Sequence, residues 1–198
     1  MTVWIVDTGL GNVAALQNML TWIGIPSARL TSPETVDERG KFLLPGVGSF
    51  DEGVRRLRSS GWFGFLKDCP PSTRILGICL GMQLLGLASE EGDESGLGRI
   101  DVNFKRFQDV PQVPHMGWND VTWGLGTPFY GGTADRMYFT HSFAGEATEA
   151  DQVVGTTLYG TDFHSACSKQ NTLGVQFHPE KSHSFGKTFL QTWYSLPC

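Results

Sequence analysis

Short apolar runs and amphipathic segments alternate along the first half of the chain. Apolar runs bounded by turn residues predict buried strands, and apolar residues three and four positions apart predict helices that face a core. The predicted strands lie at residues 3–6, 27–30, 41–44 and 74–78. The predicted helices run from residue 13 to about 23, in a short segment from Pro33, over 51–59 and 62–68, and from 80 to about 89. This alternation predicts an α/β fold with a mostly parallel, doubly wound sheet.

The second half of the chain has a different pattern. From residue 96 to about 159 the helical spacing fades, and short β runs alternate with Gly, Pro and Asn. Strands are predicted at residues 121–123, 137–139, 153–157 and 172–177, and an amphipathic helix at 185–194. Because no linker separates these strands from the first half, we expect an antiparallel β extension of the same sheet. The whole chain, residues 1–198, is then one domain.

Composition and charge narrow the possible classes of protein. The chain has 198 residues, of which 40% are hydrophobic and 18% charged, as expected of a globular domain. Its net charge of −5 argues against a nucleic-acid or anionic-membrane partner. The most apolar run, residues 75–88, is too short to span a bilayer. No signal peptide is expected, and four cysteines without paired spacing indicate the reducing cytoplasm. The cysteine and histidine spacings predict no metal site.

The central candidate for chemistry is a cysteine between two glycines, in Gly77-Ile78-Cys79-Leu80-Gly81, at the predicted junction of a strand and a helix. A nucleophile on such a sharp turn needs glycine on both sides, because a Cβ there would collide with the neighbouring element. Helix-end N–H groups favour the thiolate, and N–H groups just past the turn can hold an oxyanion. The same pattern also fits a core strand with a cysteine that is simply buried.

A partner for the thiol lies near the C-terminus, in Phe177-His178-Pro179-Glu180. Proline biases its predecessor toward extended backbone, so His178 and Glu180 are expected on one face of an extended segment. Glu180 can then orient the imidazole of His178 while the other ring nitrogen faces the thiol of Cys79. These three side chains together predict the nucleophile, base and orienting carboxylate of a catalytic triad.

These two motifs resemble the signatures of the class I glutamine amidotransferases. Within that family, the chain is most similar to the glutaminase subunits of imidazole glycerol phosphate synthases. Three further stretches support the resemblance: residues 44–50 (LPGVGSF), 113–119 (VPHMGWN) and 138–143 (YFTHSF). The five motifs follow the family's order, so the resemblance covers essentially the whole chain.

By this resemblance, the loop after the third predicted strand supplies the oxyanion hole. The corresponding residues are Gly46, Val47 and Gly48, to which the N–H of Leu80 is added. Glycines at the end of a parallel strand can bring backbone N–H groups against a ligand, although they also fit a tight turn.

The resemblance also implies a set of substrate-binding residues. Glu91 corresponds to the position that binds the α-ammonium group of glutamine, and a carboxylate facing an ammonium is suitable chemistry for that contact. Gln83 corresponds to another position that contacts glutamine. Ser142 and Phe143 correspond to positions that reach the carboxylate end through backbone groups. Phe143 stands where tyrosine is commoner in the family, so it offers no hydroxyl group.

The implied reaction is hydrolysis of the side-chain amide of L-glutamine to glutamate and ammonia, with no metal or organic cofactor. Family members pass the ammonia directly to a partner synthase. The resemblance implies a heterodimer with the (β/α)₈ cyclase of histidine biosynthesis. Five residues correspond to positions near that interface: Pro114, Trp118, Asn119, Tyr138 and Lys181. Trp118 is the kind of aromatic residue that anchors interfaces, although it also fits a core position.

Two alternatives remain at this point. Residues 178–186 also resemble a paralogous branch, whose glutaminase subunits feed synthases that amidate nucleotide-linked sugars for surface polysaccharides. A cysteine hydrolase or peptidase of related fold would also use a cysteine on a sharp turn. Such an enzyme would not require Gln83, Glu91 and the His178–Glu180 pair together, whereas a free glutamine amide as substrate accounts for all of them.

Overall fold

The computed structural model describes residues 1–34, 36 and 39–197. Its helices are α1 (Val13–Trp22), α2 (Phe50–Ser59), α3 (Trp62–Asp68), α4 (Leu80–Leu85) and α5 (His183–Ser195), with 3₁₀ turns η1 (Ala150–Gln152) and η2 (Pro179–Lys181). Its strands are β1 (Val3–Val6), β2 (Ser27–Leu30), β3 (Lys41–Gly46), β4 (Arg74–Cys79), β5 (Ala88–Ser89), β6 (Val102–Arg106), β7 (His115–Trp123), β8 (Asp135–His141), β9 (Phe143–Ala147), β10 (Val153–Tyr159), β11 (Thr161–Lys169) and β12 (Thr172–Val175). Among the described helices, none combines the length and apolar character that a bilayer crossing requires.

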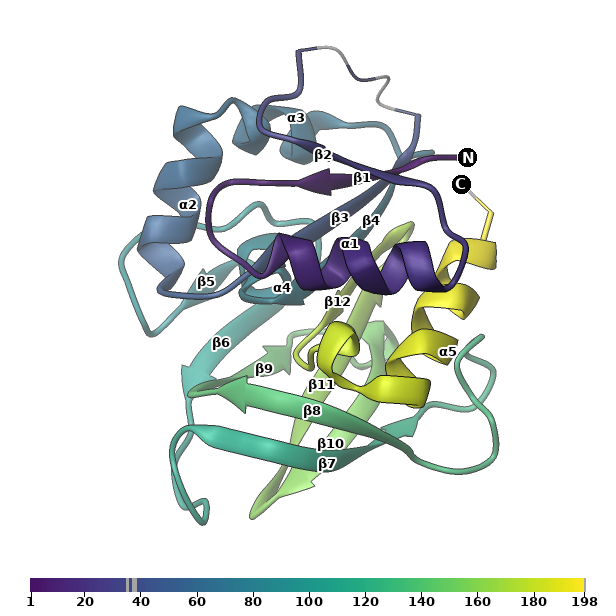
Figure 1. Ribbon diagram of the computed structural model, residues 1–198. Coiled ribbons are helices and arrows are strands. Elements are labelled where there is room, and N and C mark those ends of the chain that lie inside the picture. The colour runs from purple at the N-terminus through teal and green to yellow at the C-terminus, as the bar shows by residue number, and fades with distance from the viewer. Residues whose placement is uncertain (35, 37–38, 198) are drawn as a thin grey trace.

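One sheet runs through the whole molecule (Figure 1). Its strand order is β2-β1-β3-β4-β12-β11-β10-β7-β8. The strands from β2 to β12 in this order pair in parallel, and those from β12 to β8 pair antiparallel. The prediction of a mostly parallel, doubly wound half with an antiparallel extension is confirmed.

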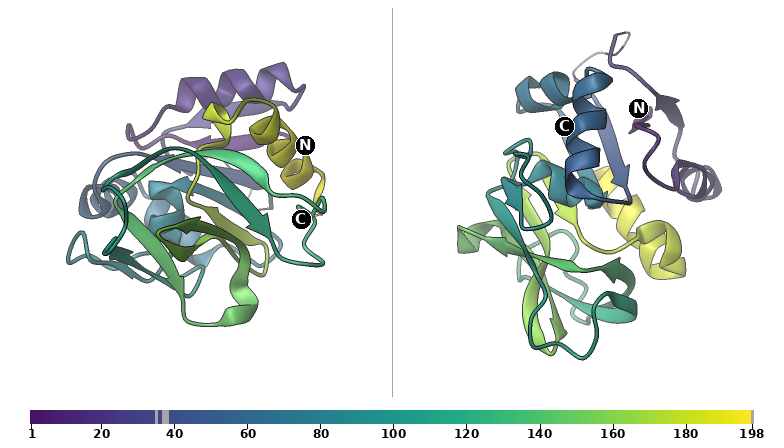
Figure 2. Two further views of the ribbon diagram at one scale, coloured as in Figure 1. Left: turned by 90° about the horizontal axis from the view of Figure 1, so that it is seen from below. Right: turned by 90° about the vertical axis from the view of Figure 1, so that its left-hand side faces the viewer.

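Helices cover both faces of the parallel half, as the right-hand view of Figure 2 shows. Side chains alternate between the two faces along each strand and so divide the core in two. On β3, Leu43 packs with buried residues of α1 and α5, whereas Phe42 and Leu44 pack with those of α2, α3 and α4. Because both faces of the central strands are buried, β1, β3 and β4 contain apolar runs, whereas the edge strand β2 is only partly buried and includes Ser27 and Arg29.

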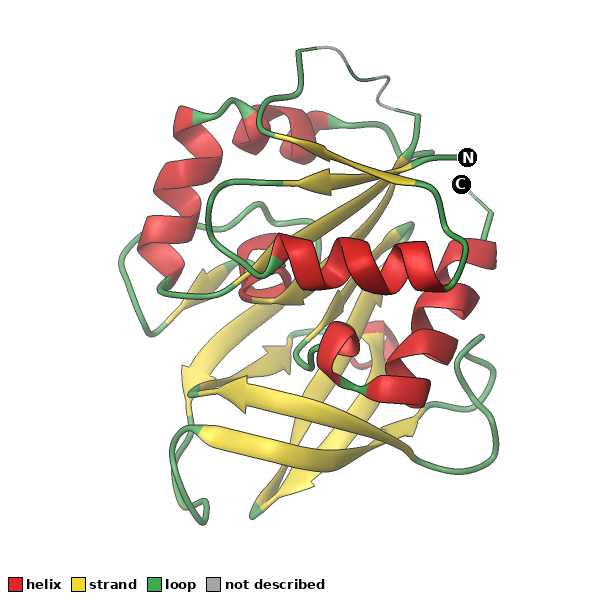
Figure 3. Ribbon diagram, in the orientation of Figure 1, coloured by secondary structure: helices red, strands yellow, loops and turns green. Residues whose placement is uncertain are grey.

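The antiparallel strands form the lower part of the molecule in Figure 3. Strands β5, β6 and β9 form a branch of this region. β6 pairs with β5 and with β9, and β9 pairs with β11, which connects the branch to the main sheet. Gly145 on β9 lies against α4, since a Cβ built on it would be 3.4 Å from Met82 Cε. The branch therefore brings the junction of β8 and β9 close to α4, which follows the candidate nucleophile.

The helix after Cys79 is shorter than predicted. The bounds of β1, β2 and α3 are confirmed, but α4 ends at Leu85 rather than near residue 89, and Ala88–Ser89 form a strand. Gly86 leaves the helix in an extended conformation, with φ −74° and ψ −166°. A Cβ on Gly86 would lie 2.6 Å from the carbonyl oxygen of Val102, so glycine allows the chain to turn against β6.

Besides β5, three strands are not predicted by the hydrophobic pattern, namely β6, β9 and β11. In β11, both apolar and polar residues occupy buried positions. Ser165 is fully buried, and its hydroxyl accepts a hydrogen bond of 2.8 Å from the hydroxyl of Thr157. Such a strand lacks a regular apolar alternation. The short helix predicted from Pro33 falls partly on residues 35, 37 and 38, which lie outside the described part of the chain.

Candidate active site

Cys79 lies on the sharp turn between β4 and α4, in a backbone conformation that L-residues rarely adopt. Its φ is 55° and its ψ −112°, which costs about 1–3 kcal/mol of strain. A Cβ on Gly81 would lie 1.7 Å from the carbonyl oxygen of Leu44, and one on Gly77 would lie 2.6 Å from the carbonyl oxygen of Gly81. Both flanking glycines are therefore required by the turn that presents the thiol.

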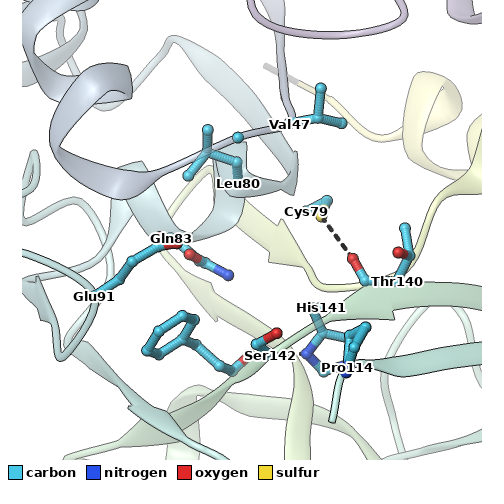
Figure 4. A pocket seen from close by; sticks show the side chains of 11 residues that line it. Val47, Cys79, Leu80, Gln83, Glu91, Pro114, Thr140, His141 and Ser142 are labelled. Carbon is cyan, nitrogen blue, oxygen red and sulfur yellow. Dashed lines mark hydrogen bonds between the residues drawn. The ribbon is translucent and has the colours of Figure 1, made fainter.

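The thiol faces a cavity of about 270 Å³ (Figure 4). This volume is slightly below the range typical of sites for drug-sized ligands, and it suits a small metabolite. The cavity brings together residues from the loop after β3, the end of β4, α4, the loop after β5, the residue before β7 and the β8–β9 junction: Val47, Gly48, Cys79, Leu80, Gln83, Glu91, Pro114, Thr140, His141, Ser142 and Phe143. Most of the residues predicted for the oxyanion hole and for substrate binding thus lie around one cavity.

Gly46 is the predicted oxyanion residue that does not line the cavity. It pairs with Cys79 across the parallel strands β3 and β4, so the two residues lie side by side. A Cβ on Gly46 would be 3.0 Å from Leu80 Cβ and 3.3 Å from the backbone nitrogen of Gly81. Gly46 therefore permits the loop of Val47 and Gly48 to lie directly against the start of α4.

The carboxylate of Glu91 is fixed at one side of the cavity. Its Oε2 accepts a hydrogen bond of 2.8 Å from the backbone N–H of Phe50, at the start of α2. The same loop is held by Asp51, whose carboxylate accepts the N–H groups of Asp93 and Glu94 at 3.2 and 3.0 Å. The acidic cluster after α4 is thus anchored to α2 rather than being only a solvated loop.

His178 and Glu180 are paired, but not through the predicted extended backbone. Nδ1 of His178 lies 2.8 Å from Oε1 of Glu180, and their side chains are 2% and 6% exposed. The chain enters the 3₁₀ turn η2 at Pro179, so the expectation of a continuous extended segment is wrong. Proline can start such a turn because its fixed φ is compatible with helical backbone and its missing N–H has no partner there.

Ser182 and the backbone of Tyr138 hold this turn in place. The hydroxyl of Ser182 donates to the carbonyl oxygen of His178 at 2.6 Å and accepts the N–H of Tyr138 at 2.9 Å. The N–H of His178 in turn donates to the carbonyl oxygen of Tyr138 at 2.8 Å. Sequence reasoning did not identify Ser182, although a small hydroxyl residue two positions after the His-Pro-Glu motif is a signal for such a turn.

The electrostatics of His178 favour an imidazolium. Burial alone would lower its pKa, but the neighbouring Cys79 sulfur and the Glu180 carboxylate outweigh burial and raise the pKa to about 10. Nε2 of His178 is buried, and within the described part of the chain no acceptor meets the geometry of a hydrogen bond to it. An imidazolium beside a thiolate is the form that activates a catalytic cysteine.

Two residues that sequence reasoning missed contact the sulfur of Cys79. The thiol donates to the carbonyl oxygen of Thr140 at 3.8 Å, as the dashed line in Figure 4 marks. Nε2 of Gln176 donates to the sulfur at 3.7 Å, and Gln83 donates to Oε1 of Gln176 at 3.5 Å. Gln176 is fully buried in an otherwise apolar stretch, which is the signal that could have identified it.

The residues that the structure describes contain no group of three or more histidine, cysteine, aspartate or glutamate side chains suited to a metal ion. The reactive groups at and next to the cavity are the Cys79 thiol, the His178 imidazole, the Glu180 carboxylate and backbone N–H groups.

Comparison with known families decides the class of this site. The sequence matches the family Glutamine amidotransferase class-I over residues 5–194. The chain belongs to this family. The resemblance drawn from the five motifs is thereby confirmed, and so is the expectation of an enzyme. The alternative of a cysteine hydrolase or peptidase from another family is excluded.

Curated relatives of this amidotransferase match it over nearly their whole length. The imidazole glycerol phosphate synthase subunit HisH 2 of Pseudomonas aeruginosa is 41% identical, with 97% of this chain and 98% of the relative covered. The subunit of the same name from Methanococcus maripaludis is 40% identical, with 96% of each chain covered. The subunit HisH of Bdellovibrio bacteriovorus is 39% identical, with 97% and 98% covered.

Solved structures with low sequence identity share the fold. A structure described as a glutamine amidotransferase has a TM-score of 0.75 at 17% identity, with 97% of this chain and 98% of that chain covered. The structure of PurLQS from Thermotoga maritima has a TM-score of 0.69 at 17% identity, with 98% and 96% covered. These proteins thus share the fold of this chain although their sequences are only 17% identical to it.

Three of the residues predicted near a partner interface form one surface cluster on the amidotransferase. Trp118 is 39% exposed, so the alternative of a core position for it is wrong. Its ring stacks on that of His183, with centroids 5.4 Å apart and planes within 7°, and contacts the edge of Tyr138. The ammonium group of Lys181 lies 5.6 Å from the centroid of the Tyr138 ring. Pro114 instead lines the cavity, and Asn119 hydrogen-bonds to His115 and to Leu158.

We expect the amidotransferase to lose stability as the pH falls below about 6.5. Burial lowers the pKa of His115 from 6.5 to about 4 and that of His141 from 6.5 to about 3. Below about pH 6.5 the unfolded chain therefore binds protons at these histidines, whereas the folded chain does not. The free energy of unfolding falls by about 1.4 kcal/mol for each histidine and each unit by which the pH is lowered. His178 has a raised pKa, so its contribution does not change in this window but is lost as the pH rises toward 10.

Urea denaturation at about pH 7 and about pH 5 measures this effect, because carboxylates and lysines titrate largely outside that interval. The midpoint should fall clearly at the lower pH. An equal midpoint at both pH values would show that the two buried histidines are not neutral in the folded chain.

Proposed function

We propose that this chain is the glutaminase subunit of an imidazole glycerol phosphate synthase. It hydrolyses L-glutamine to glutamate and ammonia and delivers the ammonia to a synthase subunit of histidine biosynthesis. The proposal is carried by one arrangement: Cys79 on a glycine-flanked turn at the cavity, with the buried His178–Glu180 pair behind it. It is supported by 41% identity over nearly the full length to a subunit of that name.

The proposed mechanism begins with attack of the Cys79 thiolate on the carbon of the side-chain amide. The resulting oxyanion is stabilised by backbone N–H groups at Val47, Gly48 and Leu80. The imidazolium of His178 gives its proton to the amide nitrogen, and ammonia leaves as the thioester forms. His178 then takes a proton from water, which attacks the thioester and releases glutamate and the free thiol. Glu180 orients the ring and stabilises its charge throughout.

The cavity residues fit the rest of the glutamine molecule. The anchored carboxylate of Glu91 would pair with the α-ammonium group, and Gln83 would contact the same substrate. Backbone groups of Ser142 and Phe143 would receive the α-carboxylate, so the missing hydroxyl of Phe143 does not matter for that contact. Gly46 would act by allowing the oxyanion loop to approach α4. No metal or organic cofactor takes part.

We further propose that the chain works in the cytoplasm as a heterodimer with the cyclase subunit. Ammonia is largely protonated near neutral pH, so an enzyme that uses it gains from receiving it directly. The cluster of Trp118, Tyr138 and Lys181 would form part of the contact, with Asn119 and Pro114 beside it. Neither a nucleic acid nor a membrane is a partner in this proposal, in line with the net charge of −5.

We expect the partner to raise the glutaminase kcat strongly. Trp118→Ala and Lys181→Ala should each reduce this stimulation by about tenfold or more, because removal of an aromatic or basic hot-spot residue usually has an effect of this size. Trp22→Ala is a control for the loss of an exposed tryptophan, because Trp22 is 69% exposed and has the ammonium group of Lys187 over its ring at 4.9 Å, much as Lys181 lies over the ring of Tyr138. Trp22 is the last residue of α1, which connects the parallel strands β1 and β2 and so ends near the amino ends of the strands, away from Cys79 at the carboxyl end of β4. Glutamate release at increasing partner concentration measures the effect. Full turnover without a partner, or equal stimulation of all three variants, would contradict this interface.

The acceptor of the ammonia is tested by product identification. The chain is combined with the cyclase, or with a synthase that amidates a nucleotide-linked sugar, together with glutamine and the partner's own substrate. Amination of the cyclase substrate alone supports the proposal. Amination of the nucleotide sugar alone would replace the cyclase by the paralogous synthase and leave the glutaminase chemistry intact.

A further inference from the structure

Two buried histidines lie at one wall of the cavity, where His141 lines the wall and His115 lies behind it, and the mechanism above does not use them. His115 on β7 and His141 at the end of β8 face each other in the antiparallel register. Nδ1 of His115 is 3.0 Å from Nε2 of His141, and the two side chains are only 2% and 5% exposed. The pair therefore forms a direct hydrogen bond inside the protein.

The neighbours of the pair fix the position of every ring proton. Nδ1 of His141 is 2.8 Å from the carbonyl oxygen of Phe143, which can only accept, so this nitrogen carries the proton. In the neutral ring Nε2 of His141 then accepts from Nδ1 of His115. The remaining nitrogen of His115, Nε2, accepts from Nδ2 of Asn119 at 3.3 Å, and the same amide donates to the carbonyl oxygen of Leu158 at 2.9 Å. The result is a one-directional chain from Asn119 to Phe143.

Aromatic rings pack around this chain of hydrogen bonds and bury both histidines. Phe139 and Tyr159 stack against His115, with centroids 4.8 and 3.9 Å away and planes tilted by 23° and 24°. Phe107 and Phe163 pack on His141 with centroids 5.1 and 5.2 Å away. The charged neighbour of the pair is the imidazolium of His178, whose positive charge opposes protonation of His141. Both burial and charge therefore hold the pair neutral.

The residues from Thr140 to Phe143 form the cavity wall that faces the thiol. The carbonyl oxygen of Thr140 accepts from the Cys79 thiol at 3.8 Å, and that of Ser142 accepts from the N–H of Phe107 at 3.0 Å. The carbonyl oxygen of Phe143 is the group held by His141. The wall is thus fixed by contacts to the nucleophile, to the neighbouring strand and to the histidine pair.

We infer that His141 is a positioning residue for glutamine binding, and that His115 keeps it in the neutral form with the proton on Nδ1. The inference rests on the proposed function, in which glutamine occupies this cavity. His141 acts through the backbone of the wall rather than by touching the substrate. A neutral donor suits this place because a second positive charge would compete with the His178 imidazolium for the thiolate.

The test measures L-glutamine binding by calorimetry in a Cys79→Ser background, where no hydrolysis occurs. His141→Asn is the matched control, because its amide can still donate from near the position of Nδ1. His141→Gln places its amide near Nε2 and leaves the Phe143 carbonyl unpaired. We expect the asparagine variant to bind within about threefold of the parent, and the glutamine variant to bind about tenfold more weakly, the usual effect of leaving one buried polar group unpaired.

Equal binding by the two variants would overturn the inference, because a merely structural role would lower the melting temperature of both without separating their affinities. A parent that fails to bind glutamine would refute the proposed function instead.

Ring ¹⁵N NMR of the unmodified chain supplies a second readout that needs no variant. His141 should be neutral with its proton on Nδ1 near neutral pH, and a charged ring or a proton on Nε2 would also overturn the inference.

Discussion

Cys79→Ala should abolish glutamine hydrolysis, with kcat lower by about 10⁴-fold or more, as removal of a covalent nucleophile does. The thioester cannot form without the sulfur, and the other groups around the cavity then act only on water. The fold should survive, because the strained φ of 55° depends on the flanking glycines rather than on the sulfur. A synthase reaction driven by added ammonium should continue in the complex, since the variant only stops the internal supply of ammonia. Glutamate release and ammonium-dependent product formation measure the two halves separately.

Cys167→Ala provides the matched control. Cys167 is fully buried, and burial raises the pKa of its thiol to about 12, so it is not a nucleophile at physiological pH. Its replacement should leave glutaminase activity nearly unchanged. Hydrolysis by Cys79→Ala, or loss of hydrolysis in Cys167→Ala with an intact melting transition, would place the nucleophile elsewhere.

Glu180→Gln should give the second large effect, a loss of about 10²–10⁴-fold in kcat with little change in KM for glutamine. The His178 pKa is raised against burial by the Cys79 sulfur and the Glu180 carboxylate together, so removal of the carboxylate lowers that pKa and weakens the thiolate–imidazolium pair. The ring also loses the 2.8 Å contact that fixes its orientation. Steady-state glutaminase kinetics in the complex give kcat and KM separately.

Glu180 is buried, so a control for folding is needed. Thermal unfolding of Glu180→Gln should show one cooperative transition, because Ser182 and the backbone of Tyr138 continue to hold the turn. Full activity in a folded Glu180→Gln variant would reduce the triad to a pair of Cys79 and His178.

The parallel half of the fold could be predicted from the sequence because burial on both faces leaves a strong local signal. The strands around Ile5 and Leu76 are continuous apolar runs, and turn residues limit them on each side. The glycine-flanked Cys79 is similarly local, since the collisions that require glycine come from the strand and helix next to it. These features depend on a few consecutive residues.

The antiparallel region could be predicted only in part, because its strands bury mixed sets of residues. The hydroxyl of Thr157 on β10 donates a hydrogen bond to that of Ser165 on β11, and no local sequence pattern indicates this pairing. The His115–His141 pair depends on the register between β7 and β8, twenty-six positions apart in the chain. The motif of His178 and Glu180 identified the correct pair for the wrong reason, because the backbone between them is a 3₁₀ turn.

In the proposed mechanism, Cys79 attacks a glutamine side chain bound in this cavity. A glutamine analogue with an electrophile in place of the side-chain amide tests this step, followed by peptide mass spectrometry. We expect a single adduct on Cys79, prevented by excess L-glutamine and slowed in Glu180→Gln. An adduct on Cys69 or Cys167, or labelling of Cys79 that glutamine does not prevent, would contradict it.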